Sequence, residues 1–503
     1  MPTRLIEIKK VEDGVELKVK ATNGSPTEPY CALSYCWGGE QSLKSTNALL
    51  PKWMDFIPWT DIPQTLRDAV SVCCKLNIKY LWVDALCIVQ DNPDEKAIEI
   101  SQMQNVYCNS TLTIAASRAA KVSEGFLSDR SATQFPDEVF TFRYKAKRLA
   151  NLGSVTLIRT QINPEPVDTR GWCLQERLLS PRTLEFGSRQ LRFICQHNPR
   201  GITDGWRLKP EANALRQDTL ESIATLQADY GVQSGNTQRT DYSNAVETWY
   251  RLVKAYTNRS LTNPKDRILA ISSIAERYSL ILNDRYLAGL WRSSLSRSLY
   301  WTTSDIKMPR PRQWQGPSWS WTSVAGAVSF PTPTDIDNDH EPQIVDIDLA
   351  LCNPDHTFGA VLEGSGRLVV KARLLPAVLQ FAPRMFGDIH TYVGSIMMNG
   401  SSGDVFYTDI SVDSLSEAEE AKEENDAVLL ELSSSLTEWE WSTRGLIARS
   451  CGEDTFTRIG TFQYRTQHDK KRKDSGSLEE WMRRANQEYN WFGRVKTEIY
   501  DII

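Results

Sequence analysis

Residues 80–116, YLWVDALCIVQDNPDEKAIEISQMQNVYCNSTLTIAA, decide the fold class of this chain. The stretch begins as a continuous apolar run, which is typical of a strand buried on both faces of a parallel sheet. A helix follows, because Pro93 and several acids stand at its start and apolar residues then recur at helical spacing. TLTIAA (111–116) ends the stretch as a second apolar strand. This order of strand, helix and strand predicts an α/β unit with a mainly parallel sheet.

The residues on either side extend the same alternation. YCALSYCW (30–37) predicts a buried strand that ends at a glycine pair, and PQTLRDAVSVCCKLNI (63–78) predicts the next helix. The later predicted elements are a strand at 154–160, a helix at 171–177 and a hairpin at 182–195. Together these elements predict a doubly wound α/β domain over residues 1–200.

The remaining chain changes its pattern twice. Residues 201–310 read as a helical region, as in NAVETWYRLVKAYTNRSL (244–261). Residues 311–503 read as a β-rich region, in which Trp319 and Trp321 alternate as packing residues of a strand would. The acidic run 417–426 and the basic DKKRKD (469–474) are interpreted as solvated loops.

Composition excludes several classes of function. The net charge of −5 gives no reason to expect nucleic acid as a partner, and no run of about 18 apolar residues predicts a membrane span. The first residues lack a signal-peptide core, and the ten cysteines show no CxxC spacing, so we expect reduced thiols, no structural zinc and a cytoplasmic protein. The first of five histidines is His197, which excludes a histidine-based catalytic or metal site within residues 1–196.

Candidate ligand-binding residues stand where the predicted strands end. Ser34, Tyr35, Trp37 and Gly38 follow the first strand and Asp84 follows the second, and ligands of open α/β sheets bind outside these ends. Trp37 could stack on a base or pack against a helix. Gly38 would let the backbone approach a phosphate, and Asp84 could instead cap the helix that follows it.

Glu176 is the candidate catalytic residue. It follows Trp172 by four positions, so the two share a helix face and Trp172 could form the wall of a ligand site. A carboxylate beside C1′ of a nucleotide could stabilise the ribosyl cation that forms when an N-glycosidic bond breaks. Alternatively, Glu176 could pair with Arg170, Arg177 or Arg182 and hold the helix in place. Arg170 could also bind a phosphate through two hydrogen bonds.

Three segments together resemble a known family. YCALSYCWGG (30–39), residues 80–116 and RGWCLQERLLSPRTLEFGSRQLRFIC (170–195) are similar in order and content to the fungal heterokaryon incompatibility (HET) domain. The resemblance implies self/non-self recognition, in which the active domain triggers programmed cell death. HET domains are also similar to TIR domains, which have a flavodoxin-like sheet and some of which hydrolyse NAD. In that likeness GWCLQERLL (171–179) resembles the TIR segment with the catalytic glutamate, which here is Glu176.

The resemblance leaves three functions open. The chain could be a cell-death effector that cleaves NAD or a related nucleotide, which would then be its substrate and not a cofactor. It could be a non-catalytic signalling module of the same fold that self-associates or binds a protein partner. It could also be an enzyme on the same scaffold that acts on another small molecule. A family resemblance alone does not distinguish these functions.

Overall fold

The computed structural model describes two compact units, Met1–Asn236 and Thr237–Ile503. The described residues are 2–12, 14–22, 28–129, 138–146, 149–157, 164–195, 198–203, 239–331, 343–386, 389–397, 409–436, 440–467, 492 and 495–503. Each unit is presented by itself. The domain boundaries near residues 200 and 310 stay predictions.

An eight-stranded sheet forms the centre of the first unit, in the order β10-β9-β8-β5-β3-β4-β1-β2. Its strands are β1 (Arg4–Val11), β2 (Gly14–Ala21), β3 (Tyr30–Ser34), β4 (Tyr80–Trp82), β5 (Leu112–Ala115), β8 (Arg182–Phe186), β9 (Leu191–Cys195) and β10 (Asn198–Thr203). The four central strands β8, β5, β3 and β4 are parallel, and the strands at both edges are antiparallel. The sheet is therefore mixed, and the prediction of a mainly parallel sheet holds only for its centre. The antiparallel pairs β1–β2 and β1–β4 form one side of the sheet, and β8–β9 and β9–β10 form the other.

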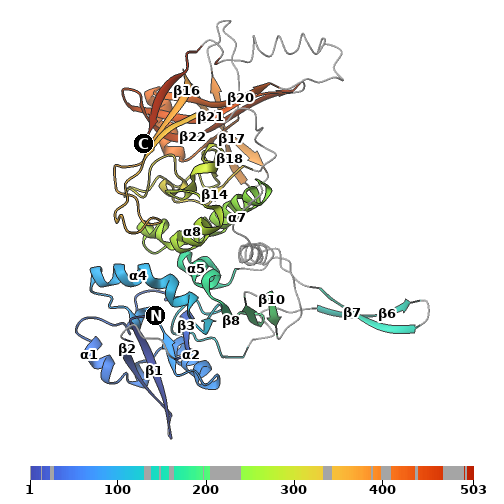
Figure 1. The fold of residues 1–503 in the computed structure, drawn as a ribbon. Coiled ribbons are helices and arrows are strands. Elements are labelled where there is room, and N and C mark those ends of the chain that lie inside the picture. Colours follow the sequence, from blue (N-terminus) through green and yellow to red (C-terminus); the bar gives the residue numbers. More distant parts are fainter. Residues whose placement is uncertain are drawn as a thin grey trace. The chain divides into compact units, whose positions relative to one another are not determined.

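Helices cover both faces of this sheet (Figure 1). They are α1 (Leu50–Asp55), η1 (Trp59–Asp61), α2 (Gln64–Lys75), α3 (Asp84–Cys87), α4 (Pro93–Cys108), η3 (Pro166–Thr169) and α5 (Gly171–Leu179). Numbered in chain order, the parallel strands β3, β4, β5 and β8 lie side by side as 2-1-3-4. Because crossover connections are right-handed, α2 lies on one face and α4 and α5 lie on the other. The chain thus winds outward from β3 in both directions.

Helix α4 shows how the sequence fixes this packing. Its first turn is capped by Asn92, whose side chain accepts a hydrogen bond of 3.2 Å from the backbone N–H of Glu95. Tyr107, near its end, packs edge-on against Trp82 with the ring centroids 5.6 Å apart. The Tyr107 hydroxyl donates to the carbonyl of Leu33 at 3.1 Å. The last turn of α4 is therefore anchored to the end of β3.

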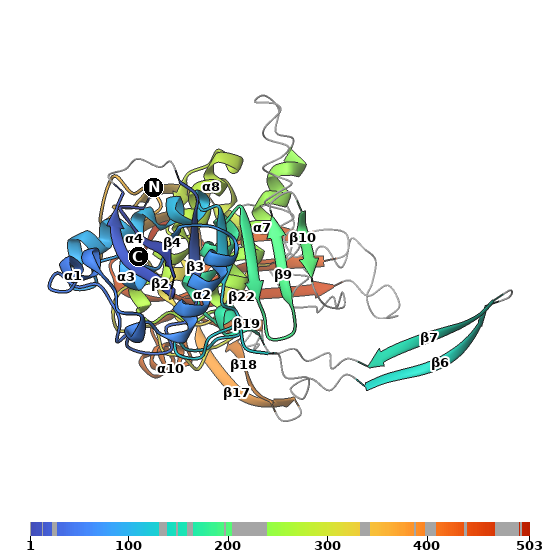
Figure 2. The same ribbon diagram turned by 90° about the horizontal axis from the view of Figure 1, so that it is seen from below.

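The strands β6 (Glu138–Ala146) and β7 (Leu149–Leu157) form a separate two-stranded sheet (Figure 2). The strand predicted at 154–160 overlaps β7, but β7 pairs with β6 and is outside the eight-stranded sheet. Apolar pattern alone could not assign the strand to either sheet, because it contains no information on pairing partners.

The second unit begins with helices around an aromatic cluster. These elements are α7 (Arg239–Thr257), η4 (Pro264–Arg267), α8 (Leu269–Leu282), β11 (Tyr286–Leu287), β12 (Leu290–Trp291), η5 (Arg292–Ser294), α9 (Leu295–Ser298), β13 (Thr302–Thr303), η6 (Trp321–Ser323) and β14 (Val328–Ser329). Trp249 of α7 contacts Trp291 edge-on, with centroids 5.4 Å apart. Trp319 and Trp321 are fully buried as predicted, but Trp321 begins a 3-10 helix, so the predicted strand is wrong there.

A nine-stranded sheet completes the second unit, in the order β15-β16-β20-β21-β22-β19-β18-β17, with β23 pairing with both β16 and β22. Its strands are β15 (Gln343–Asp348), β16 (Arg367–Pro376), β17 (Val378–Phe386), β18 (Ile389–Met397), β19 (Asp409–Val412), β20 (Ala427–Leu436), β21 (Glu440–Gly452), β22 (Thr455–Gln467) and β23 (Glu498–Ile502). The predicted β-rich region is thus confirmed. The acidic run is not a loop, because α10 (Leu415–Glu424) buries Ala418 and Ala421 against the sheet. The basic run 469–474 lies outside the described residues.

One buried arginine connects the two parts of the second unit. Arg458 of β22 is 0% exposed, and its guanidinium lies 3.6 Å from the ring centroid of Trp301. It donates two hydrogen bonds to Asp413, at 3.0 and 3.1 Å, and others to the carbonyls of Leu299 and Trp301, at 2.7 and 2.6 Å. The nine-stranded sheet is thereby hydrogen-bonded to the segment that follows α9. In the described ranges, no helix has the length and apolar character needed to cross a membrane.

Candidate functional site

Six of the predicted site residues come together at the carboxyl ends of the central strands β3 and β4: Ser34, Tyr35, Trp37, Asp84, Arg170 and Glu176. Ser34 is the last residue of β3, one residue separates the end of β4 from Asp84, and Arg170 immediately precedes α5. The neighbouring strands β3 and β5 lie where the order of the parallel strands reverses, since β3 is followed in sequence by β4 on its other side. In open α/β sheets the loops at this reversal separate and leave room for a ligand.

Ser34 and Glu176 contact each other directly. The Ser34 hydroxyl donates to Oε2 of Glu176 at 2.5 Å, and both side chains are buried, with Glu176 7% exposed. The Glu176 backbone is also fixed: its carbonyl accepts from the Ser180 hydroxyl at 2.5 Å, and that hydroxyl lies 2.6 Å from the hydroxyl of Thr113 on β5. The side chain of Glu176 is therefore held by Ser34 at the carboxyl end of β3, and its backbone is held by Ser180.

Burial sets the acidity of Glu176. It raises the pKa of the carboxyl group above its ordinary value, while the hydrogen bond from Ser34 and the positive charge of Arg170 lower it, and the charge of Asp84 raises it further. A hydrogen bond with Cys173 also lowers the pKa, but burial is the largest effect and the pKa is raised overall. Glu176 thus takes up a proton at a higher pH than a solvent-exposed glutamate.

A second carboxylate lies nearby on a different strand. Oδ2 of Asp84 accepts a hydrogen bond of 2.9 Å from the indole N–H of Trp37, and Oδ1 accepts one of 2.7 Å from the backbone N–H of Ala85. Burial raises the pKa of Asp84, and the charge of Arg170 and the hydrogen bond from Trp37 partly offset it. Tyr35 is buried beside Asp84, and burial raises the pKa of its phenol, so the phenol stays neutral at physiological pH.

Arg170 places a positive charge between these acids. Its Nη1 donates to the carbonyl of Tyr35 at 2.9 Å, which connects the start of α5 to the loop after β3. Burial by itself would lower the pKa of Arg170, but the acidic groups around it, including Glu176 and Asp84, raise the pKa overall. The guanidinium therefore stays charged, and its positive charge lowers the pKa of both Glu176 and Asp84.

Gly38 has a structural requirement that the sequence did not reveal. Its φ is +73°, and a Cβ added there would lie 2.6 Å from the Cα of Lys121. The adjacent carbonyl of Trp37 accepts a hydrogen bond of 3.3 Å from the backbone N–H of Val122. The glycine thus allows close approach of another backbone segment. Gly39, by contrast, has open space around the corresponding position.

The structure also bears on the alternative in which Glu176 is an ion-pair partner. Arg177 forms its ion pairs with Asp168 at 2.6 Å and with Glu185 at 2.5 Å, and Arg192 pairs with the other oxygen of Glu185 at 2.7 Å. Arg182 donates to a backbone carbonyl on the loop before β5, at 3.5 Å. Arg177 and Arg182 thus have partners other than Glu176, whereas the positive charge of Arg170 acts on Glu176 itself.

Three residues around Glu176 received no site role from the sequence. Tyr107 is a core residue, as its helical spacing predicts, but its hydroxyl reaches the end of β3, and spacing gives no signal for that contact. Cys36 and Cys173 pack together beside the cluster, and burial raises the pKa of Cys36 to about 11 and that of Cys173 well above its usual value. Both thiols are neutral at pH 7, so neither is an activated nucleophile.

Trp172, a predicted ligand-binding residue, is half-buried and packs against the core of the unit.

Across the described part of the chain, no group of three or more His, Cys, Asp or Glu side chains is arranged to hold a metal ion. All ten cysteines are free thiols. The chemistry of the cluster therefore rests on two carboxylates, one guanidinium, a serine hydroxyl and aromatic rings.

Comparison with known proteins identifies the family of this unit. Residues 30–176 match the family described as heterokaryon incompatibility protein (HET). Searches of curated proteins and of solved structures found no match. The matched range begins at the first residue of β3 and ends at Glu176, so it contains every residue of the cluster. The chain therefore carries a HET domain over residues 30–176, in agreement with the resemblance found in its sequence.

Proposed function

We propose that the HET domain is a cell-death effector that cleaves NAD or a related nucleotide at its N-glycosidic bond. The observation that carries the proposal is the hydrogen bond between Ser34 and Glu176, which holds a buried carboxylate at the end of β3. The strand order 2-1-3-4 supports it, because flavodoxin-like and TIR-like sheets share that order and bind ligands at its reversal.

In this proposal each group of the cluster has a role. The C1′–N bond breaks with its electron pair moving to the ring nitrogen of nicotinamide, which neutralises the pyridinium charge. The Glu176 carboxylate stabilises the positive charge that develops on the ribose. Water then forms the C1′–O bond and loses its proton to that carboxylate or to solvent. Arg170 would contact a phosphate, and Trp37 and Trp172 would flank the base and the sugar.

The raised pKa of Glu176 gives the proposal a pH signature. The ionised carboxylate is the active form, so turnover should increase as pH rises through the pKa of Glu176 and become constant above it. Because that pKa lies above the ordinary value for glutamate, the midpoint should lie at higher pH than for an exposed carboxylate.

Incubation of the full-length protein with NAD at pH 7, followed by chromatography of the products, tests the proposal. Glu176→Gln keeps the shape and removes the charge, and turnover should fall by about 10²–10³. Its melting temperature should equal or exceed that of the wild type. The reason is that the folded protein raises the pKa of this carboxyl, so stability declines as pH rises through that pKa, and glutamine removes the decline.

Glu185→Gln is the matched control, because Glu185 is also buried but pairs with Arg177 and Arg192. This variant should lose up to about 3–5 kcal/mol of stability while each folded molecule keeps normal turnover. Intact NAD and intact related nucleotides after incubation with the wild type would reject cleavage. That result would favour the non-catalytic signalling module of the same fold.

A further inference from the structure

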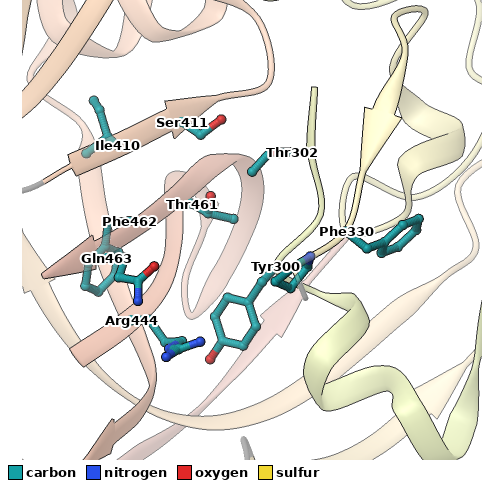
Figure 3. A pocket seen from close by; sticks show the side chains of 10 residues that line it. Tyr300, Thr302, Phe330, Ile410, Ser411, Arg444, Thr461, Phe462 and Gln463 are labelled. Carbon is teal, nitrogen blue, oxygen red and sulfur yellow. The ribbon is translucent and has the colours of Figure 1, made fainter. Parts of the chain in front are cut away.

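A pocket in the second unit, remote in sequence from the HET domain, has the features of a ligand site. Its volume is about 280 Å³. Strands β19, β21 and β22 of the nine-stranded sheet form its floor, and the segments around β13 and β14 form its wall (Figure 3). This volume lies just below the usual range for small-molecule sites, about 300–1,000 Å³, and suits a ligand with a single ring.

The strand register places polar side chains together on the floor of the pocket. Ser411 of β19 is the cross-strand partner of Thr461 of β22, and Arg444 of β21 is the partner of Gln463. Directly paired residues and residues two apart on a strand point to the same face of a sheet, so these four side chains share one face. Two hydroxyl groups, an amide and a guanidinium thus face the pocket together.

Rings form much of the rest of the lining. Tyr300 lies beside Arg444, with the guanidinium carbon 5.8 Å from the ring centroid, and its hydroxyl lies 3.2 Å from that of Ser433. Phe330, at the rim of the lining, stacks on Tyr250 with centroids 4.3 Å apart and planes 10° from parallel. Flat apolar walls of this kind favour a planar ligand.

Among the ten lining residues, Arg444 is the one with a charged side chain. Arg444 is 6% exposed, and none of the ten lining residues is acidic. A guanidinium among hydroxyl donors is suited to a carboxylate or phosphate oxygen.

We propose that this pocket binds a small aromatic anion, with its carboxylate or phosphate on Arg444 and the floor hydroxyls and its ring against Tyr300. The site is independent of the proposed nucleotide cleavage, since it uses no residue of the HET domain. It gives the second unit a recognition function of its own.

Calorimetric titration of the full-length protein tests this site with three probes of similar size. Benzoate and phenyl phosphate carry the two anionic groups, and benzamide is the neutral match. One or both anions should bind with one-to-one stoichiometry, and which of them binds more tightly distinguishes a carboxylate site from a phosphate site. Binding of benzamide as tight as that of both anions, or no binding of either anion, would overturn the proposal.

Two variants locate the binding. Arg444→Met should weaken the anion by about ten- to a hundredfold, the effect of losing a charge-assisted hydrogen bond. The control Arg449→Met removes an arginine from the same strand, outside the pocket, and should bind as the wild type does. Ser411→Trp fills the pocket without changing its charge and should abolish binding. If Arg444→Met does not fold, this second variant decides, because unchanged binding in a folded Ser411→Trp protein would refute the location. Glu176→Gln should leave binding unchanged.

Discussion

Replacing Arg458 by methionine should destabilise the second unit strongly. The guanidinium is fully buried, donates to Asp413 and to two backbone carbonyls, and lies over the ring of Trp301. Methionine fills most of the volume but donates no hydrogen bond. The carboxylate of Asp413, whose side chain is 2% exposed, would lose its bidentate partner.

The expected loss is at least about 3 kcal/mol. Removing one member of a buried ion pair costs about 3–5 kcal/mol, because it leaves the other charge buried without compensation. Each carbonyl that loses its donor adds about 1–3 kcal/mol if water does not replace the donor. Arg310 offsets part of the loss, because its Nη2 lies 3.7 Å from Oδ2 of Asp413. These contributions share one network and do not add, so we use the value for the ion pair alone.

Urea unfolding followed by tryptophan fluorescence measures this loss. The two units are expected to give separate transitions, so each is fitted by itself. The control is Arg449→Met, since Arg449 pairs with the more exposed Asp426, Glu420 and Glu424 and should contribute only about 0–1 kcal/mol.

A double variant distinguishes the cost of leaving the Asp413 charge without a partner from the cost of lost packing. Adding Asp413→Asn to Arg458→Met removes the charge that methionine leaves behind, so the double variant should be more stable than Arg458→Met alone. A loss below about 1 kcal/mol for Arg458→Met, or no recovery in the double variant, would refute this account of the contact.

Three further predictions concern the HET domain and the thiols. Ser34→Ala removes a hydrogen bond that lowers the pKa of Glu176, so this pKa should rise further. The acid limb of the turnover–pH profile should then move to higher pH, and an unmoved limb would contradict the role of this contact. Gly38→Ala should cost about 1–3 kcal/mol in thermal unfolding, because its methyl group meets the backbone of Lys121 at a positive φ, and an unchanged melting temperature would contradict this close approach. Alkylation of the denatured protein without reductant should add ten adducts by intact mass, and fewer would reveal disulfides.

The sequence predicted the parallel centre of the first sheet because β3, β4 and β5 are apolar runs and the segments between them have apolar residues at helical spacing. It did not predict the β1–β2 edge, although Val15, Leu17 and Val19 alternate with polar residues. It also missed α10, because the face that α10 buries consists of alanines within an acidic run, which contribute little to an apolar pattern.

The candidate site was predictable as a set of residues but not as a set of contacts. Ser34, Asp84 and Glu176 could be selected by their positions after strands and on a helix face. That Ser34 bonds Glu176, and that Trp37 bonds Asp84, depends on the lateral order of the strands, which periodicity does not contain. The close approach of Lys121 to Gly38 depends on the path of a loop, for which local sequence has no signal.

The contact between Ser34 and Glu176 also has a consequence for the timing of synthesis. Its two residues are 142 positions apart, and ribosomes add about 5–20 residues per second, so about 7–28 s separate the synthesis of the serine from that of the glutamate. A nascent chain, or a fragment released early by a stalled ribosome, has the loop after β3 without the carboxylate that completes the cluster. Any activity that requires both groups is therefore absent from every incomplete chain shorter than 176 residues. A cell making this protein is protected from such an activity until the whole cluster has been synthesised.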